Sequence, residues 1–410
     1  MSEVKKKRYI PLASSKYLEK TMTRYYALTQ YHRYWGKPLK RPLAWVTSGG
    51  PVELLRIFKI HPVYPEQYGA ICSTRKATEK LCQVAEAAGY SQDLCSYARS
   101  HIGSILRPDL APMGGLPKPD LLVCCNNICG TVLKWYEAVA RLLKVPLLVL
   151  DTPYLPEGYE EHTREYVLEQ VRDMIKFLEK FTGRRLNTRE MERQAALSNQ
   201  AVTLWKEIRE LCQAQPSPLN GPDLFIQMAP IVVMRGTSPV VDYYKRLKQE
   251  VAQRVENGVA AVEGEKIRLV WDNIAIWSNL FSFTKMFTEK NACFVTDTYT
   301  GGWSMVLEPG DPLESLAHAY TTVFLNRSPD FRAKQLIELV RDYRADGFVM
   351  HSNRSCKPYS LVQEVIRRKV MKETGVPGLM VEADMADPRA YAEEPIRNRV
   401  QAFMETLGGL

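Results

Sequence analysis

Short apolar runs followed by amphipathic segments recur along this chain and predict alternating strands and helices. RPLAWVTSGG (41–50) has the pattern of a strand that runs into a glycine turn, and a helix is predicted from Val52 to Ile60. KPDLLVCCNN (118–127) is an apolar run that ends in polar loop residues, which is typical of a buried parallel strand. Apolar positions recur every three or four residues from 130 to 144, and VPLLVLDTP (145–153) is the next strand. This strand–helix–strand order predicts a right-handed parallel α/β unit.

The same pattern returns in the second part of the chain. Four further strands are predicted, in KIRLVWDNIAIW (266–277), NACFVTDTY (291–299), DGFVMHSNRSC (346–356) and PGLMVEADM (377–385). Between the two series, the segment from about 160 to 213 is charged and helical in pattern, with a break near Gly183. QPSPLNGPD (215–223) is a cluster of turn-forming residues, which we interpret as an inter-domain joint.

These patterns together predict an α/β protein with two doubly wound parallel-sheet domains of the Rossmann or flavodoxin type. The expected organisation is a helical N-terminal segment (1–40), a first α/β domain (41–158), a helical linker (159–222) and a second α/β domain (223–410). Ligands of open parallel sheets gather outside the carboxyl ends of the strands. Residues that directly follow the predicted strands are therefore the first candidates for chemistry.

Composition and charge narrow the class of protein. Hydrophobic residues make up 45% and charged residues 25% of the chain, and no apolar run is long enough to cross a bilayer. No apolar segment follows the opening MSEVKKKRYI, so we expect a cytoplasmic protein without a secretory signal or a membrane partner. The net charge of +9 is spread along the chain, and the only tight basic run is 5–8. We therefore expect no nucleic-acid partner, whereas an anionic small molecule would suit this mild excess.

Nine cysteines add a candidate chemistry, at positions 72, 82, 95, 124, 125, 129, 212, 293 and 356. Without a secretory signal, buried thiols, reactive thiols or metal ligands are expected instead of disulfides. Cys95, Cys129 and Cys356 occupy loop or helix-start positions in both parts of the chain and could meet in one cleft. Thiolates are the ligands of iron–sulfur clusters, but the compact ferredoxin spacing is absent. Spacing alone leaves both a shared metal site and ordinary packed thiols open.

Longer motifs around these cysteines resemble the 2-hydroxyacyl-CoA dehydratase and benzoyl-CoA reductase family. GYSQDLCSYARSHIG (89–103) is similar to its first cluster motif, PDLLVCCNNICGTVLKWYEAVARLLKVPLLVLDTP (119–153) to its second and HSNRSCKPYS (351–360) to its third. RPLAWVTSGGPVELLRIFKIHPVYPEQYGA (41–70) resembles its N-terminal strand–helix unit with the Pro-x-Glu-Leu signature. The sequences SQDLCSYAR and NNICGTVLKWYE are most similar to those of benzoyl-CoA reductase-like and aryl-type dehydratase subunits.

The resemblance implies a 4Fe–4S cluster held by Cys95, Cys129 and Cys356, with its fourth position open. It also implies a paired homologous subunit, either a second copy or a related chain, and an ATP-dependent iron–sulfur activator that delivers single electrons. The chain has no G-x4-G-K-[ST] phosphate loop, so ATP chemistry would belong to the partner. The implied reaction is loss of water from a 2-hydroxyacyl-CoA through a ketyl radical on the thioester. In the reductase alternative, the electron enters an aromatic ring.

Few residues are candidates for acid–base chemistry. Glu53, in the Pro-x-Glu-Leu signature, is the first choice, with Ser48 or Glu66 near it in the sequence. His351 precedes Cys356 at a strand end and is a candidate proton donor. A helix-dipole role for Glu53 and a structural hydrogen bond for His351 are the alternatives.

Two basic residues flank the third cysteine. Arg354 and Lys357 are candidates to bind the phosphates of coenzyme A or to compensate the charge of the cluster. Ordinary surface charge is the alternative for both.

Three other functions stay open on the sequence. A homodimeric double-cubane reductase of the same superfamily would recruit further cysteines, such as Cys72, Cys125 or Cys293. A non-catalytic α/β binding module would be colourless and indifferent to oxygen. A regulatory or maturation subunit would keep the cluster without turning over a CoA thioester.

Overall fold

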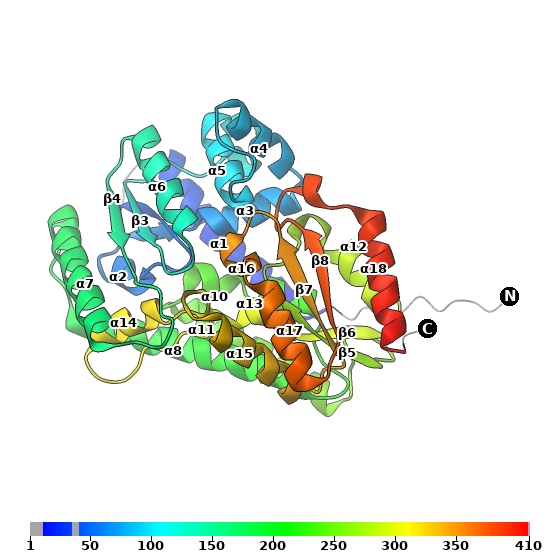
Figure 1. The fold of residues 1–410 in the computed structure, drawn as a ribbon. Helices are drawn as coiled ribbons and strands as arrows, with labels where there is room; N and C mark the ends of the chain where they lie inside the picture. The colour runs from blue at the N-terminus through cyan, green and yellow to red at the C-terminus, as the bar shows by residue number, and fades with distance from the viewer. Residues whose placement is uncertain (1–10, 35–40, 409–410) are drawn as a thin grey trace.

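The computed structural model describes residues 11–34 and 41–408, and it contains two four-stranded sheets in which every neighbouring pair is parallel (Figure 1). The first sheet has the order β2-β1-β3-β4 and the second the order β6-β5-β7-β8. The strands of the first sheet are β1 (Leu43–Val46), β2 (His61–Val63), β3 (Leu121–Cys125) and β4 (Leu147–Leu150). Those of the second sheet are β5 (Ile267–Asp272), β6 (Ala292–Asp297), β7 (Gly347–Asn353) and β8 (Gly378–Ala383). Both sheets therefore repeat one doubly wound order, which confirms the predicted α/β class.

Helices surround both sheets. Those of the described residues are α1 (Ser14–Tyr34), α2 (Val52–Ile57), α3 (Pro65–Thr74), α4 (Thr78–Ala87), α5 (Ser96–Leu106), α6 (Gly130–Leu143), α7 (Glu161–Thr182), α8 (Thr188–Glu210), α9 (Gly221–Gln227), α10 (Ala229–Met234), α11 (Ser238–Glu256), α12 (Leu280–Thr288), α13 (Thr298–Gly301), α14 (Pro312–Thr321), α15 (Pro329–Asp342), α16 (Lys357–Ser360), α17 (Gln363–Thr374) and α18 (Glu393–Thr406). A short 3-10 helix, η5 (Phe324–Asn326), joins α14 to α15.

Local sequence explains most of these boundaries. The predicted break near Gly183 separates α7 from α8, because Gly183 adopts a φ of +69° that ends α7. The strand β2 was not predicted: it has three residues and contains Pro62, so its apolar pattern is too short to recognise. It lies at the edge of the first sheet, where a proline is tolerated.

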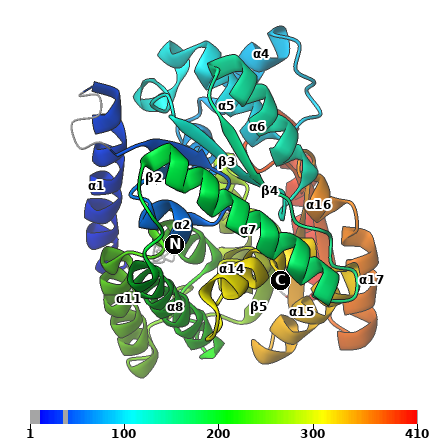
Figure 2. The same cartoon turned by 90° about the vertical axis from the view of Figure 1, so that its left-hand side faces the viewer.

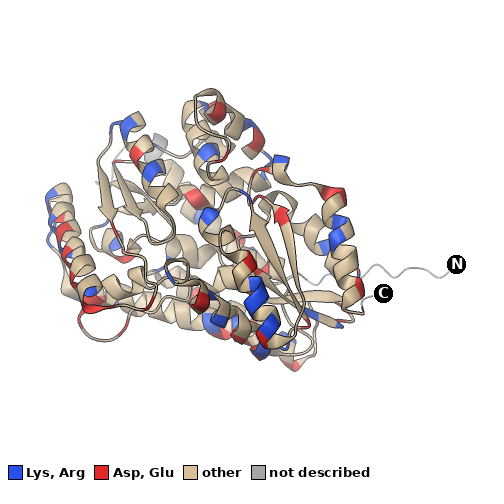
Figure 3. Ribbon diagram, in the orientation of Figure 1, with Lys and Arg blue, Asp and Glu red and all other residues tan. Residues whose placement is uncertain are grey.

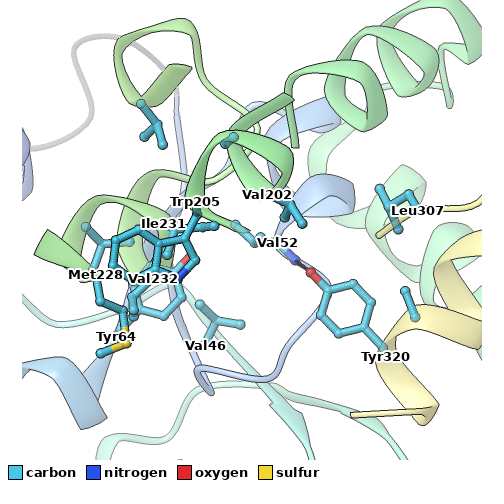
Figure 4. Close-up of a cluster of buried hydrophobic side chains, with 14 of the residues drawn as sticks. Val46, Val52, Tyr64, Val202, Trp205, Met228, Ile231, Val232, Leu307 and Tyr320 are labelled. Atoms are coloured by element: carbon cyan, nitrogen blue, oxygen red, sulfur yellow. Dashed lines mark hydrogen bonds between the residues drawn. The ribbon is translucent and has the colours of Figure 1, made fainter. Parts of the chain in front are cut away.

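The largest apolar core joins the first sheet to the helices between the two sheets. Val46 of β1 packs in this core with Trp205 of α8 and Ile231 of α10, as Figure 4 shows. Tyr320 of α14 belongs to the same core, and its hydroxyl accepts a hydrogen bond from the backbone N–H of Val52 at 3.3 Å (Figure 4). The segment 221–256 forms the helices α9, α10 and α11, joined by short turns, and α11 packs against α8, so this core continues past the predicted joint at 215–223. The predicted domain limits themselves stay a prediction.

The outer surface carries charges of both signs. Figure 2 shows α7 crossing one face of the molecule beside α14, which it contacts. Lys and Arg are interspersed with Asp and Glu along α7, whereas α17 carries mostly Lys and Arg (Figure 3), and Lys176 and Asp173 form an ion pair on α7 at 2.8 Å. The basic run 5–8 lies outside the described residues. Within residues 11–34 and 41–408, no helix combines the length and apolar character needed to cross a bilayer.

Candidate functional site

Residues that follow the central strands of both sheets line one cavity. Ser48 follows β1 and Cys129 follows β3 in the first sheet, while Ile274 follows β5 and Cys356 follows β7 in the second. In each sheet the chain changes its winding direction between these two strands, and such switch points are where doubly wound sheets bind ligands. The space measures about 950 Å³, including the part open to solvent. We call it the cysteine cavity, because Cys95, Cys129 and Cys356 all line it.

Each of the three cysteines stands immediately before a helix. Cys95 precedes α5, Cys129 precedes α6 and Cys356 precedes α16. The sequence predicted a helix start after Cys95 and after Cys129, and the structure confirms both. Burial raises the pKa of all three thiols, and backbone N–H groups of the following turns, those of Ala98, Val132 and Tyr359, offset part of that rise. Such donors favour the thiolate form that metal binding requires.

Hydrogen bonds between the two sides of the cavity fix two of these cysteines relative to each other. The backbone N–H of Ser96 donates to Ser355 Oγ at 3.1 Å, and the two serine hydroxyl groups lie 3.3 Å apart. Ser96 follows Cys95 and Ser355 precedes Cys356, so this contact joins the two cysteine loops. Burial raises the pKa of the Cys95 thiol, and the nearby sulfurs of Cys129 and Cys356 raise it further.

The kind of metal group that such thiols suit follows from their number and spacing. Across the described parts of the chain, no three His, Cys, Asp or Glu side chains converge closely enough to share one metal ion. A 4Fe–4S cluster makes a different demand, because each thiolate binds its own iron and the ligands surround the cluster. Three thiols at helix N-cap positions, from three separate loops around one largely apolar cavity, fit that demand.

Other cysteines lie in packed interiors. Cys72 is in a small core with Tyr68 and Leu81, Cys125 faces the large core from β3, and the Cys293 Sγ lies 3.6 Å from the Leu219 carbonyl oxygen. None of these three lines the cysteine cavity. Cys82, Cys124 and Cys212 are also buried.

Glu53 does not line the cavity. Its carboxylate is 2% exposed and lies 3.1 Å from Arg235 Nε, and it accepts hydrogen bonds from Ser198 Oγ at 2.8 Å and from the Tyr320 hydroxyl at 2.6 Å. Burial by itself raises the pKa of Glu53, but Arg235, Tyr320 and Ser198 outweigh it and leave the pKa below its usual value. Glu53 is therefore a charged member of a buried network.

Glu66, which the sequence analysis named only as a neighbour, is the carboxyl group that lines the cysteine cavity. It stands in the first turn of α3, directly after β2, and accepts a hydrogen bond from the backbone N–H of Ser48. Burial raises its pKa. Its position after a strand would have marked it as a candidate, but β2 was not predicted.

His351 is fully buried within β7 and does not line the cavity. Its Nδ1 lies 2.6 Å from the carbonyl oxygen of Ile274, and burial lowers its pKa. Asn273, which adopts a φ of +88°, donates a hydrogen bond to the His351 carbonyl oxygen at 2.6 Å. This pair fixes the loop that presents Ile274 to the cavity.

The two basic candidates are exposed. Arg354 forms an ion pair with Glu382 at 2.9 Å, and Lys357 Nζ donates to the Arg354 carbonyl oxygen at 3.0 Å. Neither side chain lines the cysteine cavity. A buried cation that the sequence analysis missed, Arg332, lies closer to its lining: its NH1 donates to the carbonyl oxygen of Pro358 at 2.8 Å.

Comparison with known proteins gives a consistent set of relatives. Residues 47–407 match the family model described as 2-hydroxyglutaryl-CoA dehydratase, D-component. The chain is 34% identical over 370 residues to the (R)-2-hydroxyisocaproyl-CoA dehydratase alpha subunit of Clostridioides difficile, which covers 90% of both chains. It is 31% identical over 383 residues to the lactoyl-CoA dehydratase alpha subunit of Anaerotignum propionicum (89% of this chain and 90% of the relative). It is also 29% identical over 371 residues to a benzoyl-CoA reductase subunit of Thauera aromatica (87% and 86%).

Proposed function

Because this chain belongs to the 2-hydroxyglutaryl-CoA dehydratase D-component family, we propose that it is the iron–sulfur subunit of a 2-hydroxyacyl-CoA dehydratase. One observation carries the proposal: three cysteines at helix N-cap positions, from both sheets, line a single cavity that also contains a carboxyl group, Glu66.

Cys95, Cys129 and Cys356 are the proposed cluster ligands. When bound, a 4Fe–4S cluster supplies an open, Lewis-acidic iron and accepts single electrons. Its ligands would be held in place by the Ser96–Ser355 contact described above. The activator that delivers the electrons and a paired homologous subunit are the proposed protein partners, and the dehydratase relatives are themselves alpha subunits.

Glu66 is the proposed proton acceptor. Its raised pKa makes the carboxylate a stronger base than an exposed glutamate, which suits removal of a β-hydrogen from the acyl group. The Ser48 N–H that donates to Glu66 fixes the orientation of its carboxyl group. We do not propose the acid–base role for Glu53, because its carboxylate is neutralised by Arg235 away from the cavity.

Aromatic side chains form much of the wall around these groups and limit the access of solvent to them. Trp135 comes from α6, Tyr299 from α13 and Phe324 from η5, so the apolar lining is built from both sides of the cavity. A dry site protects a reactive radical intermediate from side reactions with solvent.

Metal analysis tests the proposal directly. We expect about four irons and as many acid-labile sulfides per chain after anaerobic purification, and a loss of iron in each of Cys95→Ser, Cys129→Ser and Cys356→Ser. Cys212→Ser is the matched control, since Cys212 is buried in the core and a serine hydroxyl can keep its contact with the Ile208 carbonyl oxygen.

Two outcomes would change the assignment. A chain without iron, or with iron that is indifferent to all three substitutions, would refute the cluster and the radical chemistry with it. About eight irons per chain would favour the double-cubane alternative instead.

A reductase function is the second candidate, because a benzoyl-CoA reductase subunit is among the relatives. The two are separated by assaying the activated complex with benzoyl-CoA and with a 2-hydroxyacyl-CoA. A dehydratase forms the unsaturated acyl-CoA from the second substrate and leaves the first unchanged.

A further inference from the structure

We propose that the cysteine cavity selects an uncharged, apolar or aromatic acyl group, and that η5 is a specificity-determining segment. This inference rests on the proposed function and narrows its substrate class. It excludes dicarboxylic acyl groups such as 2-hydroxyglutaryl as preferred substrates of this chain.

The lining of the cavity carries the first part of the inference. Large apolar side chains come from both sides, and they include Trp135, Trp303, Phe324, Leu325 and Tyr359. Among the residues that the structure describes, no lysine, arginine or histidine lines the cavity, and Glu66 is its single carboxylic acid. An apolar acyl group placed here would bury its surface against side chains of its own kind.

A second carboxylate on the acyl group would meet the opposite conditions. It would lose its hydration without gaining an ionic partner, and burying an unpaired charge is strongly unfavourable. It would also enter a cavity that already holds the carboxyl group of Glu66, and two like charges in one site repel each other.

The buried cation near the cavity does not relieve this cost. Arg332 is 4% exposed, and its guanidinium carbon lies 5.4 Å from the ring centre of Phe324 and 5.3 Å from that of Tyr359. Both rings line the cavity, whereas Arg332 does not. Its NH1 and NH2 donate to the carbonyl oxygens of Pro358 and Tyr359 at 2.8 and 3.3 Å. Arg332 therefore contacts the two rings from outside the lining and holds them in place.

Hydrogen bonds to the segment that follows β4 also fix η5 in place. The side-chain amide of Asn326 donates to the carbonyl oxygen of Pro153 at 2.7 Å, and the backbone N–H of Leu155 donates to the Asn326 carbonyl oxygen at 3.0 Å. Phe324 and Leu325 are thus presented to the cavity by a segment anchored at both Asn326 contacts. A preorganised segment can discriminate between acyl groups without a further entropic cost of becoming ordered.

Calorimetric binding of defined thioesters tests the inference on the full chain, purified anaerobically with its iron. The probes are phenyllactyl-CoA, 2-hydroxyisocaproyl-CoA, 2-hydroxyglutaryl-CoA and free coenzyme A. We expect the first two to bind at least about tenfold more tightly than 2-hydroxyglutaryl-CoA, a difference of about 1.4 kcal/mol.

A charge introduced into the lining provides the matched variants. Leu325→Lys places an ammonium group in the cavity from a half-buried position, and we expect it to narrow or reverse the preference against 2-hydroxyglutaryl-CoA. Leu361→Lys is the control, because Leu361 is 83% exposed and does not line the cavity, so the same added charge should leave the preference unchanged.

Failure of this inference differs from failure of the proposed function. Equal or tighter binding of 2-hydroxyglutaryl-CoA by the wild-type chain overturns the inference but leaves a dehydratase subunit. An unchanged preference in Leu325→Lys overturns the role of η5. A chain that lacks iron and binds no thioester more tightly than free coenzyme A overturns the proposed function and the inference together.

Discussion

Glu53 and Glu66 occupy the same kind of position in the sequence, but their pKa values shift in opposite directions. Each is an acidic residue in the first turn of a short helix that follows a strand of the first sheet. Glu53 meets Arg235 in a buried core, which keeps its pKa below the usual value, whereas burial raises the pKa of Glu66 at the cavity. A residue's type and position along a helix therefore did not determine its role, and its neighbours did.

Removal of the Glu53 carboxylate should destabilise the fold. Glu53→Ala leaves Arg235 buried without its partner, and the loss of one partner of a buried pair costs about 3–5 kcal/mol of unfolding free energy. Urea unfolding measures it. The control is Glu364→Ala, whose carboxylate pairs with Arg367 on the surface and whose loss should cost less than about 1 kcal/mol. Equal losses in the two variants would contradict the role given to Glu53.

The unfolding free energy at acidic pH provides a second test of the role of Glu53. The pKa of Glu53 in the fold lies below its usual 4.5, so its charged form stabilises the protein above that pH, and this stability is lost as the pH falls through the folded-state pKa. Glu53→Gln should therefore show a flatter fall in unfolding free energy below about pH 4.5 than the wild type. A fall of the same steepness in both proteins would refute the assignment.

At the scale of elements, the helix that follows Cys95 owes its position to a close backbone approach. Helices α4 and α5 pack together, and a Cβ atom built on Gly103 of α5 would lie 2.0 Å from the carbonyl oxygen of Leu81 in α4. Only a glycine fits at this crossing, because the obstructing atom belongs to the backbone and cannot rotate away. The crossing in turn fixes where α5 begins.

Gly103→Ala should consequently push α5 away from α4. We expect a destabilisation of at least about 1–3 kcal/mol, typical of an overpacked contact, together with weaker iron binding because Cys95 moves with its helix. Thermal unfolding and iron content are the measurements. Gly158→Ala is the control, since no atom lies within 4 Å of its added Cβ. Normal stability and iron content in Gly103→Ala would show that the helices can separate without cost.

At the scale of the whole molecule, the site exists because the two sheets are tied together beside the cysteines. Arg99 of α5 pairs with Asp387, which follows β8, at 3.0 Å. Arg389 reaches back to Glu86 of α4 at 2.6 Å, and Glu86 also pairs with Arg99 at 2.5 Å. We name Glu86, Arg99, Asp387 and Arg389 the inter-sheet network. It joins the helix of Cys95 to the second sheet.

Loss of Asp387 should loosen this junction. In Asp387→Ala, Arg99 is left buried with one partner fewer, so we expect faster amide hydrogen exchange along α5 and after β8 than in the wild type. The exchange of α11, which packs against α8 and α1, should stay unchanged and serves as an internal control. Unchanged exchange along α5 would show that the Ser96–Ser355 contact is sufficient by itself.

Local patterns in the sequence were sufficient to predict the α/β class and seven of the eight strands that the structure describes, but not β2. Short apolar runs, apolar positions at three- to four-residue spacing, Gly183 and the segments around Cys95 and Cys129 are local signals, and the α/β class, the parallel strands and the helix starts follow from them. The motifs around the cysteines also indicated the family, which the matches to residues 47–407 confirm. Local signals of this kind act within a few residues, so the sequence displays them directly.

Which of the candidate side chains meet depends instead on the folded chain. The fold places Glu66 at the cavity and Glu53 in a core, because the first faces the space between the sheets and the second faces the helices behind β1. The fold also places the guanidinium group of Arg332 against the ring of Phe324, outside the cavity lining, and leaves Arg354 exposed at the surface. These outcomes depend on contacts between residues far apart in the chain, and a pattern read along the sequence contains no record of such distances.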